Sequence, residues 1–483
     1  MSDTVFHQVV IIEGRNICLS AIKPITSVLF HRFQEMYKTI NTYISQYSFS
    51  FFQVLAERAT FKKSAIHLLW LSLEQFAKLL SVFIMSVFLA RLLGPTQYGY
   101  YTYIFAFVSI FIPLASAGLP TLAIREFSQS TTGKGKIFGT MLFLQIVVGV
   151  VTFLLAVSTM VFIRTQDSTS QLLVGVLMFA LALQSGELVE SWFQSKLELH
   201  KLIPLKTTFL MFFLVCKIVV LYLNRSVEAI ITLTAIEIIL TTILMYGYFF
   251  FSKQITSIHI DFEYLKKVIK MSFPIVISGF AVMVYAKADF LFLQYYLGSN
   301  VVAQYAVALG ITEVLALFPS LLLKAATPAL LHAGRFEKEL FSHHITNIYR
   351  LMFLGFIIMV LVSFFISIPL IPLIYGSQYN VAMGMILLLS LRLFFTNFGI
   401  ARSLVVTNGS IFYFDLFTNV IGAILNVAGN ILLIPIWGWQ GAVISSLFAL
   451  FISTFVMDYF HPVLRKNLFL EMKAIISPHQ FRL

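Results

Sequence analysis

Charged side chains interrupt the long apolar stretches of this sequence and are its best candidates for chemistry. The basic ones are Lys78, Lys217, Lys287, Lys324 and Arg392, and the acidic ones are Glu74, Glu187, Glu190, Glu237, Asp289, Glu313 and Asp415. At the centre of a membrane-spanning helix a charge costs roughly 2.5–3.5 kcal/mol, so it serves a function or is neutralised by a partner. Lysine and arginine can bind phosphate oxygens, and a carboxylate can take up a proton or a sodium ion. Neutralisation is the alternative, as for Glu74 and Lys78, which lie four residues apart on one helix face.

Sequence motifs of catalytic and metal centres are absent. There is no GxxxxGK[ST] phosphate loop and no GxSxG nucleophile elbow. The one close histidine group, His332 with the pair His343-His344, has no acidic ligand set beside it. We therefore expect a protein without enzymatic activity, cofactor or metal centre.

The composition indicates a membrane protein with many spans. Of the 483 residues, 59% are hydrophobic and 11% are charged, whereas a soluble domain has about 25% charged residues. The formal net charge of +12 does not indicate nucleic-acid binding, because the basic residues lie in short loops between apolar stretches and report orientation. The cysteines are Cys18 and Cys216, which predict no disulfide framework.

Twelve apolar stretches are long enough to cross a bilayer as helices, for which about 20 residues suffice. They lie near residues 66–92, 99–122, 137–163, 171–193, 203–223, 229–251, 271–296, 301–330, 348–375, 380–402, 411–434 and 439–460. We therefore predict an all-α polytopic membrane protein of about twelve transmembrane helices.

Lysine and arginine flank these stretches in the pattern of the positive-inside rule. With the N-terminus in the cytoplasm, the outer loops contain only Arg164 and Arg225, with Arg91 at a boundary. An even number of spans places the C-terminus on the same side. We predict a multi-pass protein of the inner (cytoplasmic) membrane with both termini cytoplasmic.

The spans divide into two sets of six. The predicted parts are a cytoplasmic N-terminal extension (1–64), a first six-helix bundle (65–252), a cytoplasmic linker (253–270), a second six-helix bundle (271–462) and a cytoplasmic tail (463–483). The extension mixes aromatic and charged residues, which suits an amphipathic helix on the membrane surface. A loosely ordered extension, or a start site assigned too early, is the alternative.

A short sequence echo relates the two sets of spans. The first half contains FLARLLGPTQYGYYTYIFAF and the second contains FLFLQYYLGSNVVAQYAVAL. With a shift of 204 residues, Gly94 aligns with Gly298 and Tyr101 with Tyr305. Both segments carry turn residues between spans. Six spans per half give both halves the same orientation, as in transporters built from parallel repeats.

The first of these segments resembles the turn after the first span of bacterial polysaccharide flippases. These are the O-antigen and capsule translocases of the multidrug/oligosaccharidyl-lipid/polysaccharide exporter superfamily. Their LARxLGPxxFGxY-like turn is matched here by Leu89, Ala90, Arg91, Leu93, Gly94, Pro95, Gly99 and Tyr101. The continuation GLPTLAIREFSQ, and Asp289 ahead of the second Leu-Gly turn, also resemble the family.

The resemblance implies two six-helix bundles that meet at a cavity lined by spans one, two, seven and eight. It implies that the protein flips undecaprenyl-pyrophosphate-linked oligosaccharide from the inner to the outer leaflet by alternating access. On that basis, the candidate contacts of the anionic head group are Lys78, Lys287, Lys324 and Arg392, with Arg91 as an interfacial anchor or a further contact at the cavity mouth, and the candidates for coupling to H⁺ or Na⁺ are Asp289 and Glu313.

The expected partners are the lipid-linked oligosaccharide, membrane lipids and the glycan polymerase machinery. A cation-coupled exporter of small molecules or drugs from the same superfamily is the first alternative. A membrane glycan polymerase or ligase is less favoured, because the longest predicted outer loop has only about seven residues. Asn419, Asn426 and Asn430 form a polar stripe, which we interpret as helix packing.

Overall fold

The computed structural model describes residues 59–129, 133–164, 167–252, 258–317, 319–320, 323, 338–409 and 411–478. All regular secondary structure in these ranges is helical, which confirms the predicted all-α class. The chain divides into two compact units, Met1–Trp70 and Leu71–Leu483, and the contacts described below lie within the second unit. Nearly all of the predicted extension lies outside the described residues, and the predicted part boundaries stay predictions.

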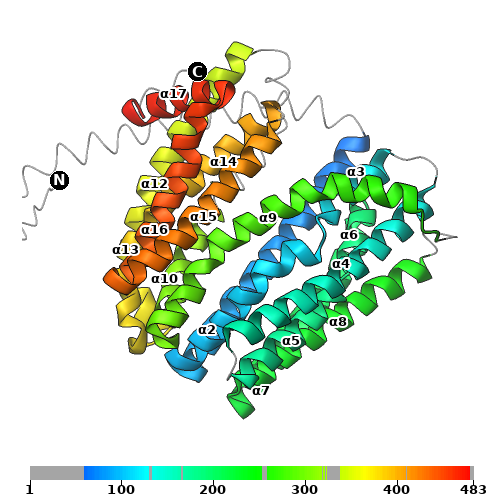
Figure 1. Ribbon diagram of the computed structural model, residues 1–483, viewed down its shortest axis with the longest axis horizontal. Helices are drawn as coiled ribbons and strands as arrows, with labels where there is room; N and C mark the ends of the chain where they lie inside the picture. The colour runs from blue at the N-terminus through cyan, green and yellow to red at the C-terminus, as the bar shows by residue number, and fades with distance from the viewer. Residues whose placement is uncertain are drawn as a thin grey trace, which may run out of the picture. The chain divides into compact units, whose positions relative to one another are not determined.

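The helices follow one another with short connections. The first half has α2 (Ala59–Ala115), α3 (Leu119–Gln129), α4 (Lys134–Ile163), α5 (Ser168–Ala182), α6 (Gly186–Ser195), η2 (Leu199–Lys201), α7 (Ile203–Asn224) and α8 (Val227–Phe251). The second half has α9 (Phe262–Leu297), α10 (Ser299–Leu315), α12 (Lys338–Ile374), η3 (Ser377–Tyr379), α13 (Asn380–Ser390), α14 (Arg392–Gly409), α15 (Phe412–Trp437), α16 (Trp439–Phe451), η4 (Ile452–Val456), η5 (Met457–Phe460) and α17 (Pro462–Ile476). Within the second unit, Figure 1 shows the helices of each half gathered together, with α9 between the two groups.

Nine helices in the described ranges are long and apolar enough to cross a membrane, or ten if a bent pair is one span. That pair, α13 with α14, bends by 42° and covers the tenth predicted span. α10 is a shorter apolar helix and covers the start of the eighth. These helices confirm a multi-pass helical membrane protein, and the count of twelve stays a prediction.

α2 consists of two helices that meet at Gly94. Its 57 residues would be about 85 Å long as one straight helix, far more than the roughly 30 Å of a bilayer core. Gly94 has φ 76° and ψ 173°, a conformation that residues with a Cβ rarely adopt. Pro95 follows with the fixed φ that suits the first turn of a helix. The Gly-Pro pair therefore makes the predicted turn between the first two spans.

The second half repeats this turn between α9 and α10. Gly298 has φ 82° and ψ 174°, nearly the same conformation as Gly94. The next residue, Ser299, begins α10, as Pro95 begins the second part of α2. The sequence echo therefore corresponds to the same backbone turn in both halves.

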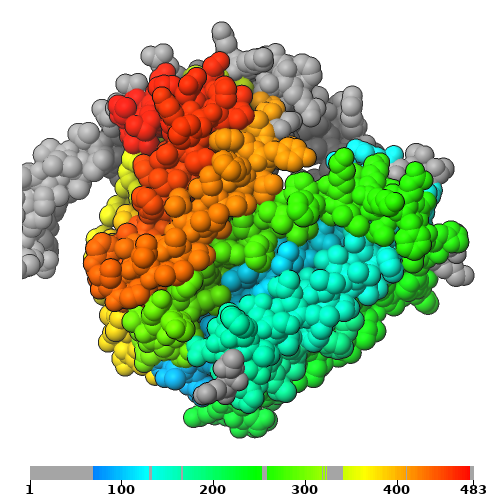
Figure 2. Space-filling view, viewed as in Figure 1, coloured from blue at the N-terminus to red at the C-terminus, as the bar shows by residue number. Residues whose placement is uncertain are grey.

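Three apolar cores stabilise the described part of the second unit. One lies in the first half around Phe107 and Leu177, and another lies in the second half around Phe398. The third contains residues of both halves, among them Leu89 and Tyr305. α9 packs on α15 of its own half and on α4 of the other, and Figure 2 shows its green surface following the seam between them. α9 can therefore present side chains to both halves.

The last helix, α17, is bound to the second half by buried polar groups. Asn467 Nδ2 donates to the hydroxyl of Tyr349 at 2.8 Å and to Glu471 Oε1 at 2.7 Å. The Glu471 side chain is fully buried. Its burial, followed by the negative charge of Asp458, raises the pKa of Glu471 to about 8.

This carboxyl makes the docking of α17 sensitive to pH. Its ordinary pKa is 4.5, so between about pH 5 and pH 8 the docked helix binds more protons than an undocked one. The docking free energy is therefore greatest in acid and falls by up to about 1.4 kcal/mol per pH unit through that window. We expect amide hydrogen exchange in α17 to rise by up to about tenfold per pH unit beyond the intrinsic rate. Glu471→Gln should remove this excess. If exchange in α17 of the unsubstituted protein follows the intrinsic rate alone, the prediction is wrong.

Candidate functional site

Asp289 is buried in the second half and surrounded by hydrogen-bond donors. Its Oδ2 accepts hydrogen bonds from the hydroxyls of Tyr305 at 2.7 Å and Ser446 at 2.6 Å. Its Oδ1 accepts from the side-chain amides of Asn426 at 3.1 Å and Asn430 at 2.9 Å. The residue is 0% exposed. Around a buried carboxylate, donors of this kind take the place of water.

Four helices supply this carboxylate and its four donors. Asp289 lies on α9, Tyr305 on α10, the two asparagines on α15 and Ser446 on α16. The asparagines are four residues apart and so project from one face of α15. A Cβ on Gly429 would lie only 2.4 Å from the hydroxyl oxygen of Ser445. Small residues of this kind let membrane helices approach closely, and here they bring α15 and α16 together at the carboxylate.

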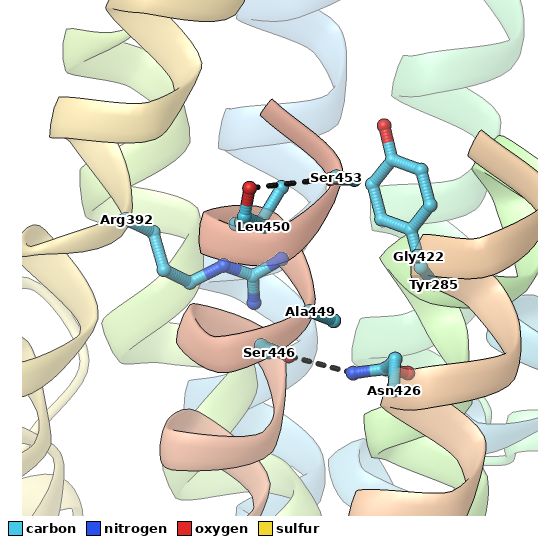
Figure 3. Close-up of a pocket in the computed structure, with 8 residues that line it drawn as sticks. All are labelled: Tyr285, Arg392, Gly422, Asn426, Ser446, Ala449, Leu450 and Ser453. Atoms are coloured by element: carbon cyan, nitrogen blue, oxygen red, sulfur yellow. Dashed lines mark hydrogen bonds between the residues drawn. The ribbon is translucent and has the colours of Figure 1, made fainter. Parts of the chain in front are cut away.

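Arg392 brings a positive charge to the cluster. Its Nη1 lies 3.5 Å from Asp289 Oδ2 and 3.3 Å from the Tyr305 hydroxyl. Figure 3 shows the guanidinium extending toward Ser446 and Asn426, which are themselves hydrogen-bonded at 3.0 Å. The arginine begins α14 at the bend that follows α13. A separation of 3.5 Å exceeds the 2.7–2.9 Å typical of strong ionic hydrogen bonds, so the two charges face each other without a short hydrogen bond between them.

A small cavity lies next to three of the residues that contact Asp289. A cavity of about 10 Å³ is lined by Arg392, Asn426 and Ser446 among other residues, which is room for about one water molecule. Within the described residues, the side-chain oxygen of Asn430 is buried without a hydrogen-bond partner. Carboxylate, amide and hydroxyl oxygens are ligands of hard cations. In this arrangement, however, Asn426 and Asn430 turn their side-chain N–H groups toward Asp289, and the positive charge nearest the carboxylate is that of Arg392.

At the Gly94 turn the first half touches the second. Arg91 donates to the carbonyls of Leu373 and Ile374, at the C-terminal end of α12, where the helix dipole favours a cation. The Ala90 carbonyl accepts from the Tyr379 hydroxyl at 3.0 Å. Arg91 is thus engaged by backbone carbonyls of the other half.

At Gly99 the backbones of the two halves lie close together. A Cβ there would lie 1.7 Å from the Ser299 carbonyl oxygen and 3.1 Å from the Ala303 nitrogen, so only glycine fits against the start of α10. We call residues 90–99, 299–303 and 373–379 together the inter-half contact.

Lys78 lies apart from the Asp289 cluster, in a polar cavity of about 210 Å³ in the first half. Its Nζ is 2.6 Å from Glu74 Oε1. Lys206 Nζ is 2.8 Å from the same oxygen and also pairs with Glu190. Lys78 is therefore paired within its own helix, as the neutralisation alternative anticipates.

The remaining candidates from the sequence lie at separate places. Lys287 on α9 is half-buried, with its Nζ 5.7 Å from the centre of the Phe290 ring. Glu313 on α10 has an exposed side chain, and Lys324 lies outside the described residues. Of the predicted site residues that the structure describes, Asp289 and Arg392 are in contact, and the charge of Glu313 acts on Arg392.

Four partners of Asp289 were not predicted as site residues. Asn426 and Asn430 are the polar stripe that we interpret from the sequence as helix packing. Two amides one turn apart in an apolar helix are costly enough to indicate a site, so a signal existed. Tyr305 and Ser446 could not be singled out from the sequence, because single hydroxyl groups commonly form hydrogen bonds between membrane helices.

Comparison with known proteins places the chain at the level of family and fold. Residues 66–333 match the family model described as polysaccharide biosynthesis protein. No curated protein sequence matches the chain significantly. Among solved structures, the lipid II flippase MurJ in an inward closed conformation matches with a TM-score of 0.64 at 12% identity, over 86% of this chain and 91% of that one. An inward-facing multidrug resistance MATE family transporter of the MOP superfamily matches with a TM-score of 0.60 at 15% identity, over 85% and 96%. These matches show the shared fold of the superfamily's transporters.

Proposed function

The chain belongs to the polysaccharide biosynthesis protein family of membrane transporters, and on that premise we propose that it flips undecaprenyl-pyrophosphate-linked oligosaccharide repeat units. The direction is from the inner to the outer leaflet of the cytoplasmic membrane, in support of surface polysaccharide synthesis. Both termini lie in the cytoplasm in this proposal, because the lysines and arginines concentrate in the loops on that side.

In this proposal Lys287 binds the pyrophosphate head group of the substrate, and the position of the side chain supports that role. Phe280, Val284 and Leu291 of α9 pack against the core of the first half, and helical spacing puts Lys287 on the same face. Lys287 makes no ion pair with the part of the chain that the structure describes. It lies ten residues before Leu297, the end of α9, which is about 15 Å of helix and half of a bilayer core. An unneutralised ammonium at the seam between the halves suits a pyrophosphate that passes between them.

Alternating access gives the inter-half contact its role. The contact closes one end of the seam through Arg91, Gly99 and Tyr379, and we assign it to the outer side. Release of the substrate outward then requires these contacts to separate. When the outer contact opens, the two halves would come together at the cytoplasmic end of the seam.

We assign cation coupling to Asp289. In this proposal Arg392 competes with the coupling cation for the Asp289 carboxylate. When H⁺ or Na⁺ occupies the carboxylate, the charge that holds Arg392 is lost. Arg392 begins α14 at the 42° bend, so its release frees the helix pair to move relative to α9. A cation that binds one conformation better than the other shifts the equilibrium by that difference in affinity.

Lys287→Ala should lower the flipping rate by about 10- to 100-fold, because a hydrogen bond to a charged group contributes about 1.5–3 kcal/mol. The measurement is the transfer of lipid-linked oligosaccharide in proteoliposomes. Lys287→Arg should restore most of the rate. Lys270→Ala, an exposed lysine of the same helix, should leave it unchanged.

Deletion of the gene tests the proposed function as a whole. We expect lipid-linked repeat units to accumulate on the cytoplasmic leaflet while surface polysaccharide is lost. Normal surface polysaccharide together with altered drug sensitivity would identify a small-molecule exporter instead. Sugar transfer by the purified protein would contradict both kinds of transporter.

A further inference from the structure

The face of α17 that points away from the second half carries an apolar stripe with basic residues beside it. Phe469 is 69% exposed and Ile476 is 76% exposed, with Met472 on the same stripe. The basic residues beside this stripe, Lys466 and Lys473, are also exposed. Large apolar side chains are expected in contact with lipid within the spans, but α17 lies beyond the last candidate span, which ends at Phe460. Its exposed apolar stripe therefore needs a separate explanation.

The path of the chain keeps this helix at the level where the span ends. One extended residue, His461, separates η5 from α17. On its buried face, Leu464 and Ala474 belong to the second-half core, together with Tyr349, which lies in the first part of the α12 span Phe341–Ile374. Figure 1 shows α17 turned away from the direction of α16 at that end of the helices. The helix is therefore held across the end of the spans, where it meets the membrane surface.

The basic side chains match the charge of one particular surface. Arg465 begins the stripe, with its guanidinium carbon 5.9 Å from the centre of the Tyr459 ring, next to the end of the span, and helical spacing puts Lys466 and Lys473 along one edge of the stripe. A helix with an apolar stripe flanked by lysine and arginine lies in the interface of a bilayer that contains anionic lipids. Lysine stems can cover apolar surface while their ammonium groups reach the head groups.

We propose that α17 is a lipid-binding element, with Phe469, Met472 and Ile476 inserted among acyl chains and Arg465, Lys466 and Lys473 bound to the phosphates of anionic phospholipids. The element is independent of the substrate path, since the α9 seam and the Asp289 cluster are formed by other helices. Its role is to attach the end of the second half to the membrane surface while the rest of that half moves.

The test uses the full chain in lipid nanodiscs, with Cys18 and Cys216 replaced by serine and an environment-sensitive fluorophore on Met472→Cys. Discs with about one third phosphatidylglycerol are compared with discs of phosphatidylcholine alone. We expect a blue-shifted emission and quenching by a lipid-borne quencher in the anionic discs. Both should weaken at high salt, because screening reduces attraction at a surface.

A triple variant, Arg465→Gln/Lys466→Gln/Lys473→Gln, should reduce the preference for anionic discs by about tenfold or more, since each basic residue near the surface contributes about 1 kcal/mol. The matched control is Lys266→Gln/Lys267→Gln/Lys270→Gln, which removes the same charge from α9 and should leave the α17 signal unchanged. Equal burial of the label in both kinds of disc would overturn the proposal, as would an unchanged preference in the triple variant. Both variants leave Leu464, Asn467, Glu471 and Ala474 in place, so the docking of α17 is retained.

Discussion

Asp289→Asn is expected to abolish the response of this transporter to its coupling cation and to lower flipping by at least about 100-fold. Asparagine keeps the size of the side chain but removes the charge that Arg392, Tyr305 and Ser446 face. Loss of one partner from a buried ion pair costs about 3–5 kcal/mol, because the other charge stays buried without compensation. The amide would also bring an N–H donor toward groups that are themselves donors.

The direct readout is the thermal stability of the purified protein against sodium concentration and pH. A ligand that binds only the folded state raises stability with its concentration, so the unsubstituted protein should respond to the coupling cation. Asp289→Asn should melt at a temperature that does not depend on that cation. Persistence of the wild-type response in the variant would exclude Asp289 as the coupling site.

Two further variants separate coupling from simple destabilisation. The double variant Asp289→Asn/Arg392→Gln removes both charges. It should therefore recover the stability lost in Asp289→Asn, but it should not recover the response to the cation. Asn419→Ala changes the same face of α15, where Asn419 bonds to Ser278 at 3.4 Å and Asp415 at 3.3 Å. This control should keep the response, because within the described residues Asn419 bonds to Ser278 and Asp415 and not to Asp289.

Gly99→Ala is expected to have the second large effect, on the closure of the inter-half contact. The added Cβ would lie 1.7 Å from the Ser299 carbonyl oxygen, a backbone atom that cannot rotate away. Overpacking in a tight interface typically costs 1–3 kcal/mol, and a clash with backbone belongs at the upper end, about 3 kcal/mol. The closed conformation should therefore lose that stability relative to the open one.

Labelling of a cysteine beneath the contact measures this shift. Ser86→Cys lies on α2, eight residues before Gly94, and Ser86 is 3.5 Å from the Tyr375 hydroxyl of the other half. A membrane-impermeant maleimide added from outside should label it slowly in the parent and at least about tenfold faster with Gly99→Ala. Gly310→Ala is the matched control on α10, because a Cβ there meets nothing within 4 Å. Equal labelling in all three proteins would contradict the assignment of this contact as the outer closure.

The sequence alone determined the membrane class, the turns and the family. Hydropathy acts over about 20 consecutive residues, so the spans can be predicted without knowledge of their neighbours. Gly94 and Gly298 could be predicted as equivalent turns because a positive φ is a local requirement on a single residue. The LARxLGPxxFGxY-like resemblance is likewise local, and the family match agrees with it.

Only the tertiary structure decided how the buried charges pair. Asp289 could be singled out from the sequence, but its donors Tyr305 and Ser446 lie 16 and 157 residues away, and helix packing alone brings them within hydrogen-bond distance. Arg91 bonds to backbone carbonyls, which every residue possesses and no sequence motif marks. Arg392 stays a predicted contact of the substrate, and only helix packing shows that its Nη1 also lies 3.5 Å from Asp289 Oδ2. In a membrane helix the cost of a charge is local and can be read from the sequence, whereas the partner that offsets the cost is set by packing between distant helices.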